Sequence, residues 1–153
     1  MQMKLEAKSL TPGAGRTYRY GGSDTIFKIT GDETGDRYEI HESTLAPGGG
    51  PPPHIHSDVI HSFFVLEGDV EFWVGQERLL TPTGGFVFVP AGIPHTFRNH
   101  GSSTVRWLQV DSPGGRERMF KEFSEKLAGV SAPDERRVLG EILEKYDTVM
   151  AKD

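Results

Sequence analysis

Four of the six histidines of this chain fall in two short stretches. His54, His56 and His61 lie within GGGPPPHIHSDVIHSFFVLEG, and His95 follows in PAGIPHTFRN. Because side chains at positions i and i+2 of a strand point to the same face, we expect His54 and His56 to lie side by side. A third imidazole after a short turn and a fourth from a partner strand would complete a cage for a metal ion.

The chemistry of such a cage follows from its ligands. Neutral imidazoles suit the divalent transition metals Mn, Fe, Co, Ni, Cu and Zn. Without a carboxylate ligand the centre keeps its full positive charge, which makes it a stronger Lewis acid and attracts an anionic oxygen such as an enolate or a carboxylate. If His54, His56, His61 and His95 fill four of six positions, two neighbouring positions stay open for a bidentate substrate, or for substrate beside dioxygen.

Three other interpretations of the histidines remain open. The cluster can be a set of structural or surface histidines that bind no metal. His61 can make a hydrogen bond near the cage without binding the metal. The ion can also be purely structural, although closed structural zinc sites usually carry cysteines and this chain has none.

The elements that must position these histidines are short strands. The chain has 19 Gly and 10 Pro, nearly all before residue 116, and they separate short apolar runs, a pattern typical of strands joined by tight turns. About nine or ten strands at this spacing favour a β-sandwich or barrel. Residues 1–24 are expected to form an N-terminal arm or edge strand. The expected strands include 25–30, 37–46, 62–68, 70–75, 86–90, 95–99 and 104–110.

The pattern changes to a helical one in residues 113–153. Apolar residues repeat there at intervals of three and four, which predicts two amphipathic helices. We expect both helices to cover an outer face of the barrel within a single domain. The first carries Met119, Phe120, Phe123, Leu127 and Val130, and the second Val138, Ile142, Leu143, Tyr146 and Met150.

Composition excludes several classes of function. There are 17 Lys and Arg against 22 Asp and Glu, a formal charge of −5 with no basic block, so neither nucleic acid nor an anionic membrane surface is an expected partner. The N-terminal MQMKLEAKSL lacks the apolar core of a signal peptide, and no apolar run reaches membrane-spanning length, so a cytoplasmic location is expected. The absence of cysteine excludes disulfides, thiolate ligands and a cysteine nucleophile.

The two histidine stretches resemble the two motifs of the small single-domain cupins of the conserved-barrel type. The first motif is a Gly, five residues, His-x-His, three or four residues, a Glu, six residues and a Gly. The second is a Gly, five residues, Pro-x-Gly, two residues, a His, three residues and an Asn. Residues 13–127 look like the quercetin-dioxygenase-like branch of these cupins. The matching positions are Gly48, His54, His56, His61 and Gly68 for the first motif, and Gly84, Pro90, Gly92, His95 and Asn99 for the second.

The resemblance implies an all-β fold, a double-stranded β-helix (jelly-roll) barrel over residues 25–112, with a metal inside and assembly as a homodimer. One position departs from the family: its motif glutamate is His61 here. In quercetinases that glutamate is a ligand and is thought to act as the base, so quercetinase activity itself does not follow. Some small cupins hold manganese or another divalent ion on histidines alone, and this chain looks more like those.

Strand parity also predicts what surrounds the metal. Residues two apart from His61 and His95 share their faces, and an apolar cavity around a metal suits an aromatic or otherwise hydrophobic small substrate. Parity predicts Phe63, Val65 and Phe97 as lining residues. Further candidates are the aromatic Trp73, and His41, which lies in the preceding strand and can face either the cavity or the solvent.

Three functions are compatible with these features. The first is a metal-dependent oxygenase acting on a small enolisable or aromatic compound with dioxygen. The second is a metal-dependent isomerase, lyase or hydrolase, which needs no oxygen but needs a proton-transfer group, for which the sequence offers His41 and the carboxylates Glu39, Glu42 and Asp58. The third is a non-catalytic module that binds a small ligand. We favour the first.

Overall fold

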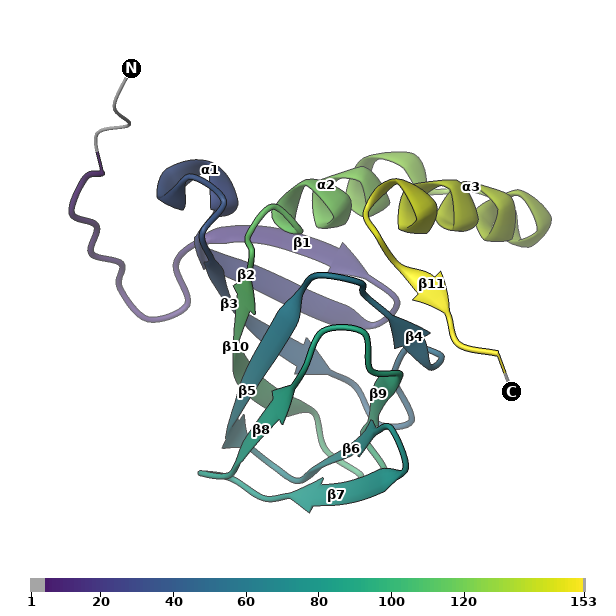
Figure 1. The fold of residues 1–153 in the computed structure, drawn as a ribbon, viewed down its shortest axis with the longest axis horizontal. Helices are drawn as coiled ribbons and strands as arrows, with labels where there is room; N and C mark the ends of the chain where they lie inside the picture. The colour runs from purple at the N-terminus through teal and green to yellow at the C-terminus, as the bar shows by residue number, and fades with distance from the viewer. Residues whose placement is uncertain (1–4, 153) are drawn as a thin grey trace.

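The computed structural model describes residues 5–152, so the first four residues of the expected arm lie outside the described part. Eleven strands form two antiparallel sheets, one of six strands in the order β1-β2-β3-β10-β5-β8 and one of five in the order β11-β4-β9-β6-β7 (Figure 1). The all-β jelly-roll architecture is therefore confirmed. The strands are β1 (Arg16–Tyr20), β2 (Ser23–Ile29), β3 (Glu39–Leu45), β4 (His54–Ile55), β5 (Ile60–Glu67), β6 (Val70–Val74), β7 (Glu77–Thr81), β8 (Phe86–Val89), β9 (His95–Arg98), β10 (Val105–Ser112) and β11 (Val149–Met150).

The barrel forms because its strands alternate between inward and outward residues. In β10, Trp107, Gln109 and Asp111 are buried while the residues between them are half-buried, the period of two that a strand with one covered face requires. Apolar inward residues fill the end of the barrel remote from the helices. They are Leu45, Phe63, Val65, Val70, Phe72, Val87, Val89, Val105 and Trp107.

The glycine-rich loop before β4 approaches β9 closely. Gly50 has a φ of 143°, and a Cβ atom there would lie 2.1 Å from the backbone oxygen of Phe97, so only glycine fits. Thr96 donates a hydrogen bond of 2.5 Å to the carbonyl of Pro51 in the same loop. These contacts bring β4 beside β9, where His54 pairs with His95.

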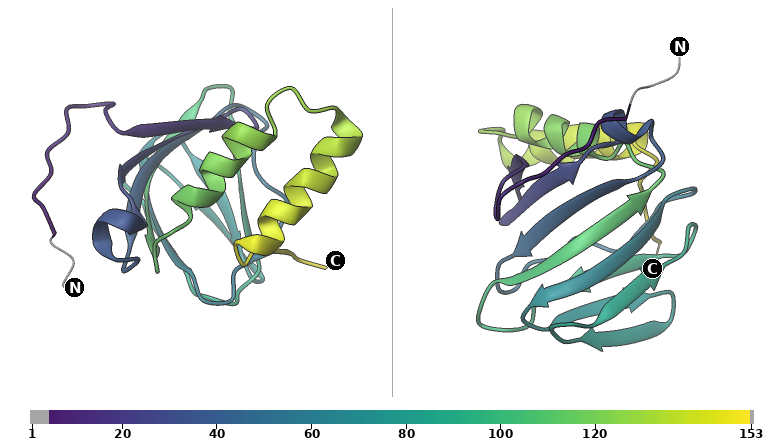
Figure 2. Two further views of the ribbon diagram at one scale, coloured as in Figure 1. Left: turned by 90° about the horizontal axis from the view of Figure 1, so that it is seen from above. Right: turned by 90° about the vertical axis from the view of Figure 1, so that its left-hand side faces the viewer.

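Three helices complete the described structure: α1 (Gly31–Thr34), α2 (Glu117–Lys126) and α3 (Ala132–Lys145). The α1 helix lies between the two expected strands 25–30 and 37–46. The expectation that the C-terminal helices cover an outer sheet face is wrong, because α2 and α3 lie across one end of the barrel (Figures 1 and 2). Their apolar residues Phe123 and Leu143 face into the cavity that opens at this end.

The second C-terminal helix is shorter than its apolar pattern predicts. It ends at Lys145, and Asp147 then adopts a left-handed φ of 51° that turns the chain back. Met150, expected on the helix, lies in β11, which pairs with β4. The apolar repeat alone does not show where the helix ends, because a return strand of two residues can carry the same apolar residues as one more helical turn.

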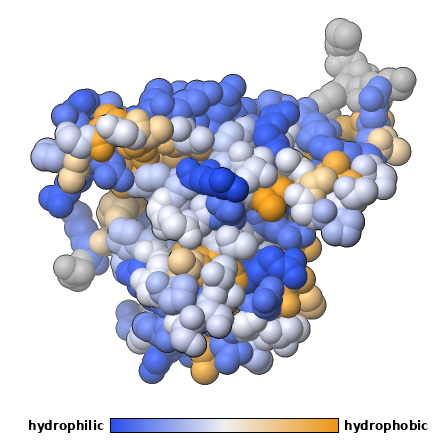
Figure 3. All heavy atoms as spheres, turned by 180° about the vertical axis from the view of Figure 1, so that it is seen from behind, coloured by the Kyte–Doolittle hydropathy of each residue, from blue (hydrophilic) through white to orange (hydrophobic). Residues whose placement is uncertain are grey.

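From behind, the surface is mostly hydrophilic, with apolar atoms gathered at the upper left, where the helices lie in this view (Figure 3). No helix within residues 5–152 has the length and apolar character needed to cross a membrane.

Candidate metal centre

The four histidines predicted as ligands meet inside the barrel. The ring centroid of His54 lies 4.9 Å from that of His56 and 4.4 Å from that of His95. Nitrogen atoms of these three histidines lie within 4.8 Å of one another and form the tightest potential metal-binding group of the described residues. His61 is not part of this triad, but its ring centroid lies 5.0 Å from His56 and 5.1 Å from His95.

All four rings are oriented in the same way. Each directs Nδ1 at an oxygen atom, which favours a proton on Nδ1 and leaves the Nε2 lone pair free. The Nε2 atoms of His56 and His61 are buried without a hydrogen-bond partner. This arrangement fits a transition metal bound through Nε2. The oxygen partners are the carbonyls of Pro52 for His54 (2.9 Å), Asp147 for His56 (3.1 Å) and Ile93 for His95 (2.9 Å), and the carboxylate of Asp111 for His61 (2.5 Å).

Burial keeps the imidazoles of His54, His56 and His95 neutral. It lowers the pKa of His54 to about 3 and that of His95 to about 4, since a charged ring loses its hydration inside the barrel. Burial, followed by the nearby positive charge of Arg116, lowers the pKa of His56 to about 2. Metal binding requires neutral imidazole, so at neutral pH no proton has to be displaced from these rings.

Asp111 is a functional residue that the sequence reasoning missed. It is fully buried, and it accepts hydrogen bonds from His61 Nδ1 at 2.5 Å and Gln109 Nε2 at 2.7 Å, while His41 Nε2 lies 3.4 Å away. Burial alone would raise the pKa of Asp111, but the two neighbouring imidazoles outweigh it and hold that pKa well below its usual value. The register of β10 against β5 places Asp111 directly opposite His61. The alternation that makes Trp107 and Gln109 inward residues could have indicated Asp111 as well.

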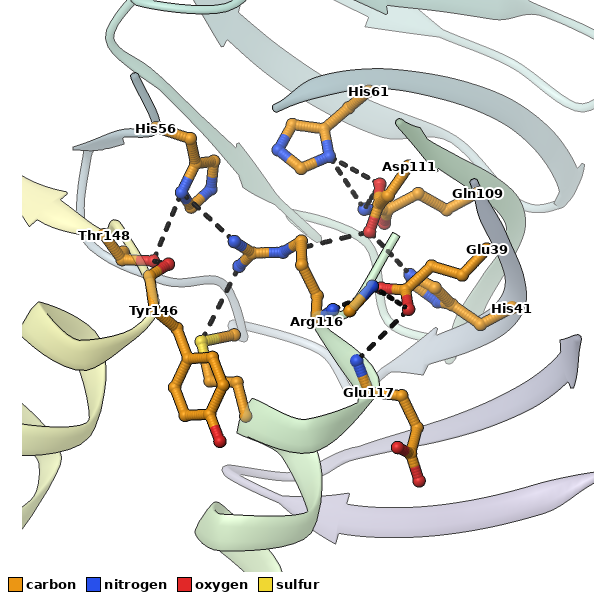
Figure 4. A network of polar contacts seen from close by, with 12 residues as sticks. Glu39, His41, His56, His61, Gln109, Asp111, Arg116, Glu117, Tyr146 and Thr148 are labelled. Carbon is orange, nitrogen blue, oxygen red and sulfur yellow. Dashed lines mark hydrogen bonds and ion pairs between the residues drawn. The ribbon is translucent and has the colours of Figure 1, made fainter. Parts of the chain in front are cut away.

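Arg116 was also missed, and the sequence carries no signal for it. It is buried, with Nη1 at 3.2 Å from His56 Nδ1 and Nε at 3.8 Å from Asp111 (Figure 4). Its position depends on Glu39, which accepts hydrogen bonds from the backbone nitrogens of Gly115 (2.9 Å) and Arg116 (2.9 Å) at the start of α2. Glu39 therefore holds the start of α2 in place. The C-terminal segment contacts the centre separately, through the backbone carbonyl of Asp147 at His56.

A cavity of about 380 Å³ lies between the histidines and the helices. Among the predicted lining residues, Phe63, Phe97 and His41 contact it. The helical end supplies an apolar cover over the histidines, so the cavity combines one polar end with apolar walls, as small-molecule sites do. The covering residues include Met119, Phe120, Phe123, Leu139 and Leu143.

Two predicted lining residues lie elsewhere. Val65 is fully buried in the apolar core. It lies beyond Phe63 on the same face of β5, and the cavity does not extend past Phe63 on this strand. Trp73 points to the outer side of β6, where its Nε1 donates a hydrogen bond of 2.7 Å to Glu71 and its side chain is half-exposed. Parity explains this correction, since Phe72 is the residue of β6 that packs inward against Phe63.

Comparison with known proteins agrees with this architecture. Residues 41–111 match the family model of the cupin domain. Quercetin 2,3-dioxygenase of Bacillus subtilis is 33% identical over 95 residues, which are 62% of this chain but only 28% of that enzyme. The chain therefore contains a cupin domain over residues 41–111, with a histidine cluster suited to a divalent metal.

Solved structures give the same fold with different named activities. The polyketide cyclase RemF from Streptomyces resistomycificus superimposes with a TM-score of 0.61 at 25% identity, covering 70% of this chain and 80% of RemF. KdgF from Halomonas sp. has a TM-score of 0.64 at 12% identity, covering 74% of this chain and 99% of KdgF, and supports the fold alone. One barrel hosts many reactions, so the reaction has to be argued from the site.

Proposed function

We propose that this protein is a metal-dependent oxygenase that acts on a small enolisable or aromatic compound. The divalent transition metal would be held by His54, His56, His61 and His95. The observation that carries the proposal is the orientation of the imidazoles. Each directs Nδ1 at an oxygen atom, and the buried Nε2 atoms of His56 and His61 have no hydrogen-bond partner beside an apolar cavity. The 33% identity to a quercetin 2,3-dioxygenase over 95 residues supports an oxygenase in particular.

The bound ion would supply Lewis-acid activation of a substrate oxygen and, for a redox-active metal, a site for dioxygen. The chain supplies the rest. Asp111 holds His61 in the tautomer that frees Nε2. The apolar walls and the helical cover exclude water and favour a hydrophobic substrate. His41 lines the cavity with Nδ1 at 3.0 Å from Ser43 Oγ and Nε2 facing Asp111, and it is the group we assign to accept the proton of an enol or phenol.

Oxygen consumption tests the proposal. Protein purified without metal is loaded separately with Mn, Fe, Co, Ni or Cu and mixed with a panel of flavonols, β-diketones and phenols in an oxygen electrode. We expect metal-dependent oxygen uptake with at least one combination, and its loss in His95→Ala. A matched control is His100→Ala, because His100 lies on the surface, where its Nε2 is 3.5 Å from Glu71. No uptake with any loaded metal would contradict the proposal.

A second candidate is a metal-dependent lyase, isomerase or cyclase that needs no oxygen, supported by the 25% identity to a polyketide cyclase. The buried His41–Asp111 pair supplies the proton-transfer group that such a reaction requires. Turnover under strictly anaerobic conditions, retained with zinc, would favour this candidate over the oxygenase. Binding of a panel compound without any turnover would instead favour a small-ligand-binding cupin.

A further inference from the structure

Arg116 is a buried cation at the polar end of the cavity. Its side chain comes from the start of α2, lines the cavity and is 8% exposed. Figure 4 shows the guanidinium between His56 and Asp111. A desolvated guanidinium carries five N–H donors, and each donor left without an acceptor costs free energy.

The contacts of Arg116 satisfy these donors poorly. Nη1 lies 3.2 Å from His56 Nδ1, Nη2 lies 3.8 Å from the sulfur of Met119, and Nε lies 3.8 Å from Asp111 Oδ2. Among residues 5–152, neither terminal nitrogen has a hydrogen bond to an oxygen atom. The ion pair with Asp111 uses only the Nε side of the guanidinium, so both terminal amino groups remain available.

Metal binding would remove even the contact with His56. Nδ1 of His56 can either carry a hydrogen, which it donates in a hydrogen bond to the carbonyl of Asp147 at 3.1 Å, or accept a hydrogen bond from Nη1 of Arg116 at 3.2 Å. Coordination through Nε2 requires the first arrangement, because a neutral imidazole has a single N–H. Nη1 of Arg116 then faces another donor and has no acceptor, next to a site that has gained positive charge.

We infer that Arg116 binds an anionic oxygen group of the substrate, so that the substrates are small hydrophobic carboxylates or similarly charged compounds. A carboxylate matches the two terminal nitrogens of a guanidinium and relieves the donors described above. The apolar body of the same molecule would lie against Phe63, Phe97 and the helical cover. The inference rests on the proposed metal site and narrows its substrate class.

Calorimetric titration of two matched probes tests the inference. Phenylacetate carries the anion, and 2-phenylacetamide has nearly the same shape without the charge. Both are titrated into zinc-loaded and metal-free protein, using wild type, Arg116→Gln and Arg116→Lys. Arg118→Gln is the matched control, since Arg118 lies on the same helix but pairs with Asp32 and Asp36 at the surface. Zinc affinity is measured separately by competition with a chromogenic chelator, and circular dichroism reports folding.

We expect zinc-loaded wild type to bind phenylacetate more tightly than metal-free protein and more tightly than it binds the amide. Arg116→Gln should weaken phenylacetate binding about tenfold or more, the range for a lost hydrogen bond to a charged group, and affect the amide far less. Arg116→Lys should retain part of the affinity, and Arg118→Gln all of it. Zinc affinity should be unchanged or higher in Arg116→Gln, because a neighbouring cation is removed.

Two results would overturn the inference: no phenylacetate binding to folded, zinc-loaded wild type, or equal losses for the acid and the amide in both Arg116 variants. If Arg116→Gln does not fold, phenylacetate affinity is compared between Arg116→Lys and wild type. Equal affinities would mean that the guanidinium is not needed. Failure of wild type to bind zinc would contradict the proposed metal centre. Phenylacetate binding to the metal-free protein would then still show whether Arg116 is the anion's partner.

Discussion

Replacing Asp111 by asparagine should weaken metal binding without dismantling the barrel. The carboxylate accepts a hydrogen bond of 2.5 Å from His61 Nδ1 and is fully buried. Asparagine keeps the size of the side chain and one acceptor oxygen but removes the negative charge. His61 is then held less firmly in the tautomer that presents Nε2.

The magnitude can be worked out in two ways. A hydrogen bond to a charged group contributes about 1.5–3 kcal/mol. Loss of a residue that orients a metal-binding histidine typically costs about 10–100-fold in metal affinity, which is about 1.4–2.7 kcal/mol. The two ranges overlap, so we expect Asp111→Asn to weaken zinc binding by about one to two orders of magnitude.

The assay is competition with a chromogenic chelator, with thermal unfolding measured on the same samples. Glu39→Gln is the matched control, because Glu39 is also a fully buried carboxylate but binds backbone nitrogens at the start of α2. It should lower the unfolding temperature and leave the zinc affinity within about threefold.

A zinc affinity in Asp111→Asn within about threefold of wild type would refute the reasoning. So would equal losses in both variants, since they would show that any buried carboxylate of this barrel acts through general stability. A lower unfolding temperature in Asp111→Asn without a change in zinc affinity would assign Asp111 a structural role only.

Three further predictions concern the same centre. His61→Glu should still bind metal but change the order of preference among Mn, Fe, Co, Ni, Cu and Zn, and unchanged selectivity by elemental analysis would place His61 outside the ligand set. The metal-free protein should lose stability as the pH falls from about 6.5 toward about 4. The reason is that His54, His56 and His95 have lower pKa values in the folded protein than in the unfolded chain. The unfolded chain therefore takes up protons that the folded protein excludes. The loss should reach several kcal/mol by order of magnitude and should shrink when zinc is bound. Urea unfolding measures it, and a free energy of unfolding that does not change with pH in this window would contradict the prediction. Asp147→Gly keeps the left-handed backbone conformation but removes the carboxylate that Ser57 contacts at 2.7 Å and 2.8 Å. Urea unfolding should then show a free energy of unfolding lower by about 1–2 kcal/mol. A stability equal to wild type would contradict a stabilising role of this carboxylate.

The homodimer implied by the family resemblance stays a prediction. The outer faces of β5 and β8 carry exposed aromatic residues, among them Phe64 and Phe86, which are paired across the two strands. An exposed apolar patch of this kind is common at sites of protein contact. Light scattering on the purified protein measures the oligomeric state directly.

The sequence by itself determined most of the strands and the histidine cluster. Both depend on local rules: alternation places His54 and His56 on one side of the chain, and glycine and proline mark the turns. Those rules also indicated Phe63 and Phe97 correctly as neighbours of the cavity. They could not place Trp73, because the spacing within one strand does not say which of its two faces the sheet turns inward.

Only the tertiary structure decided what surrounds the histidines. Asp111 meets His61 across a strand pair that joins residues 50 positions apart, and Asp147 meets His56 across 91 positions. Arg116 enters the cavity because α2 lies across the end of the barrel instead of along its side. Such contacts depend on strand register and helix placement, which arise from the packing of the whole chain, and a local pattern contains no information about them.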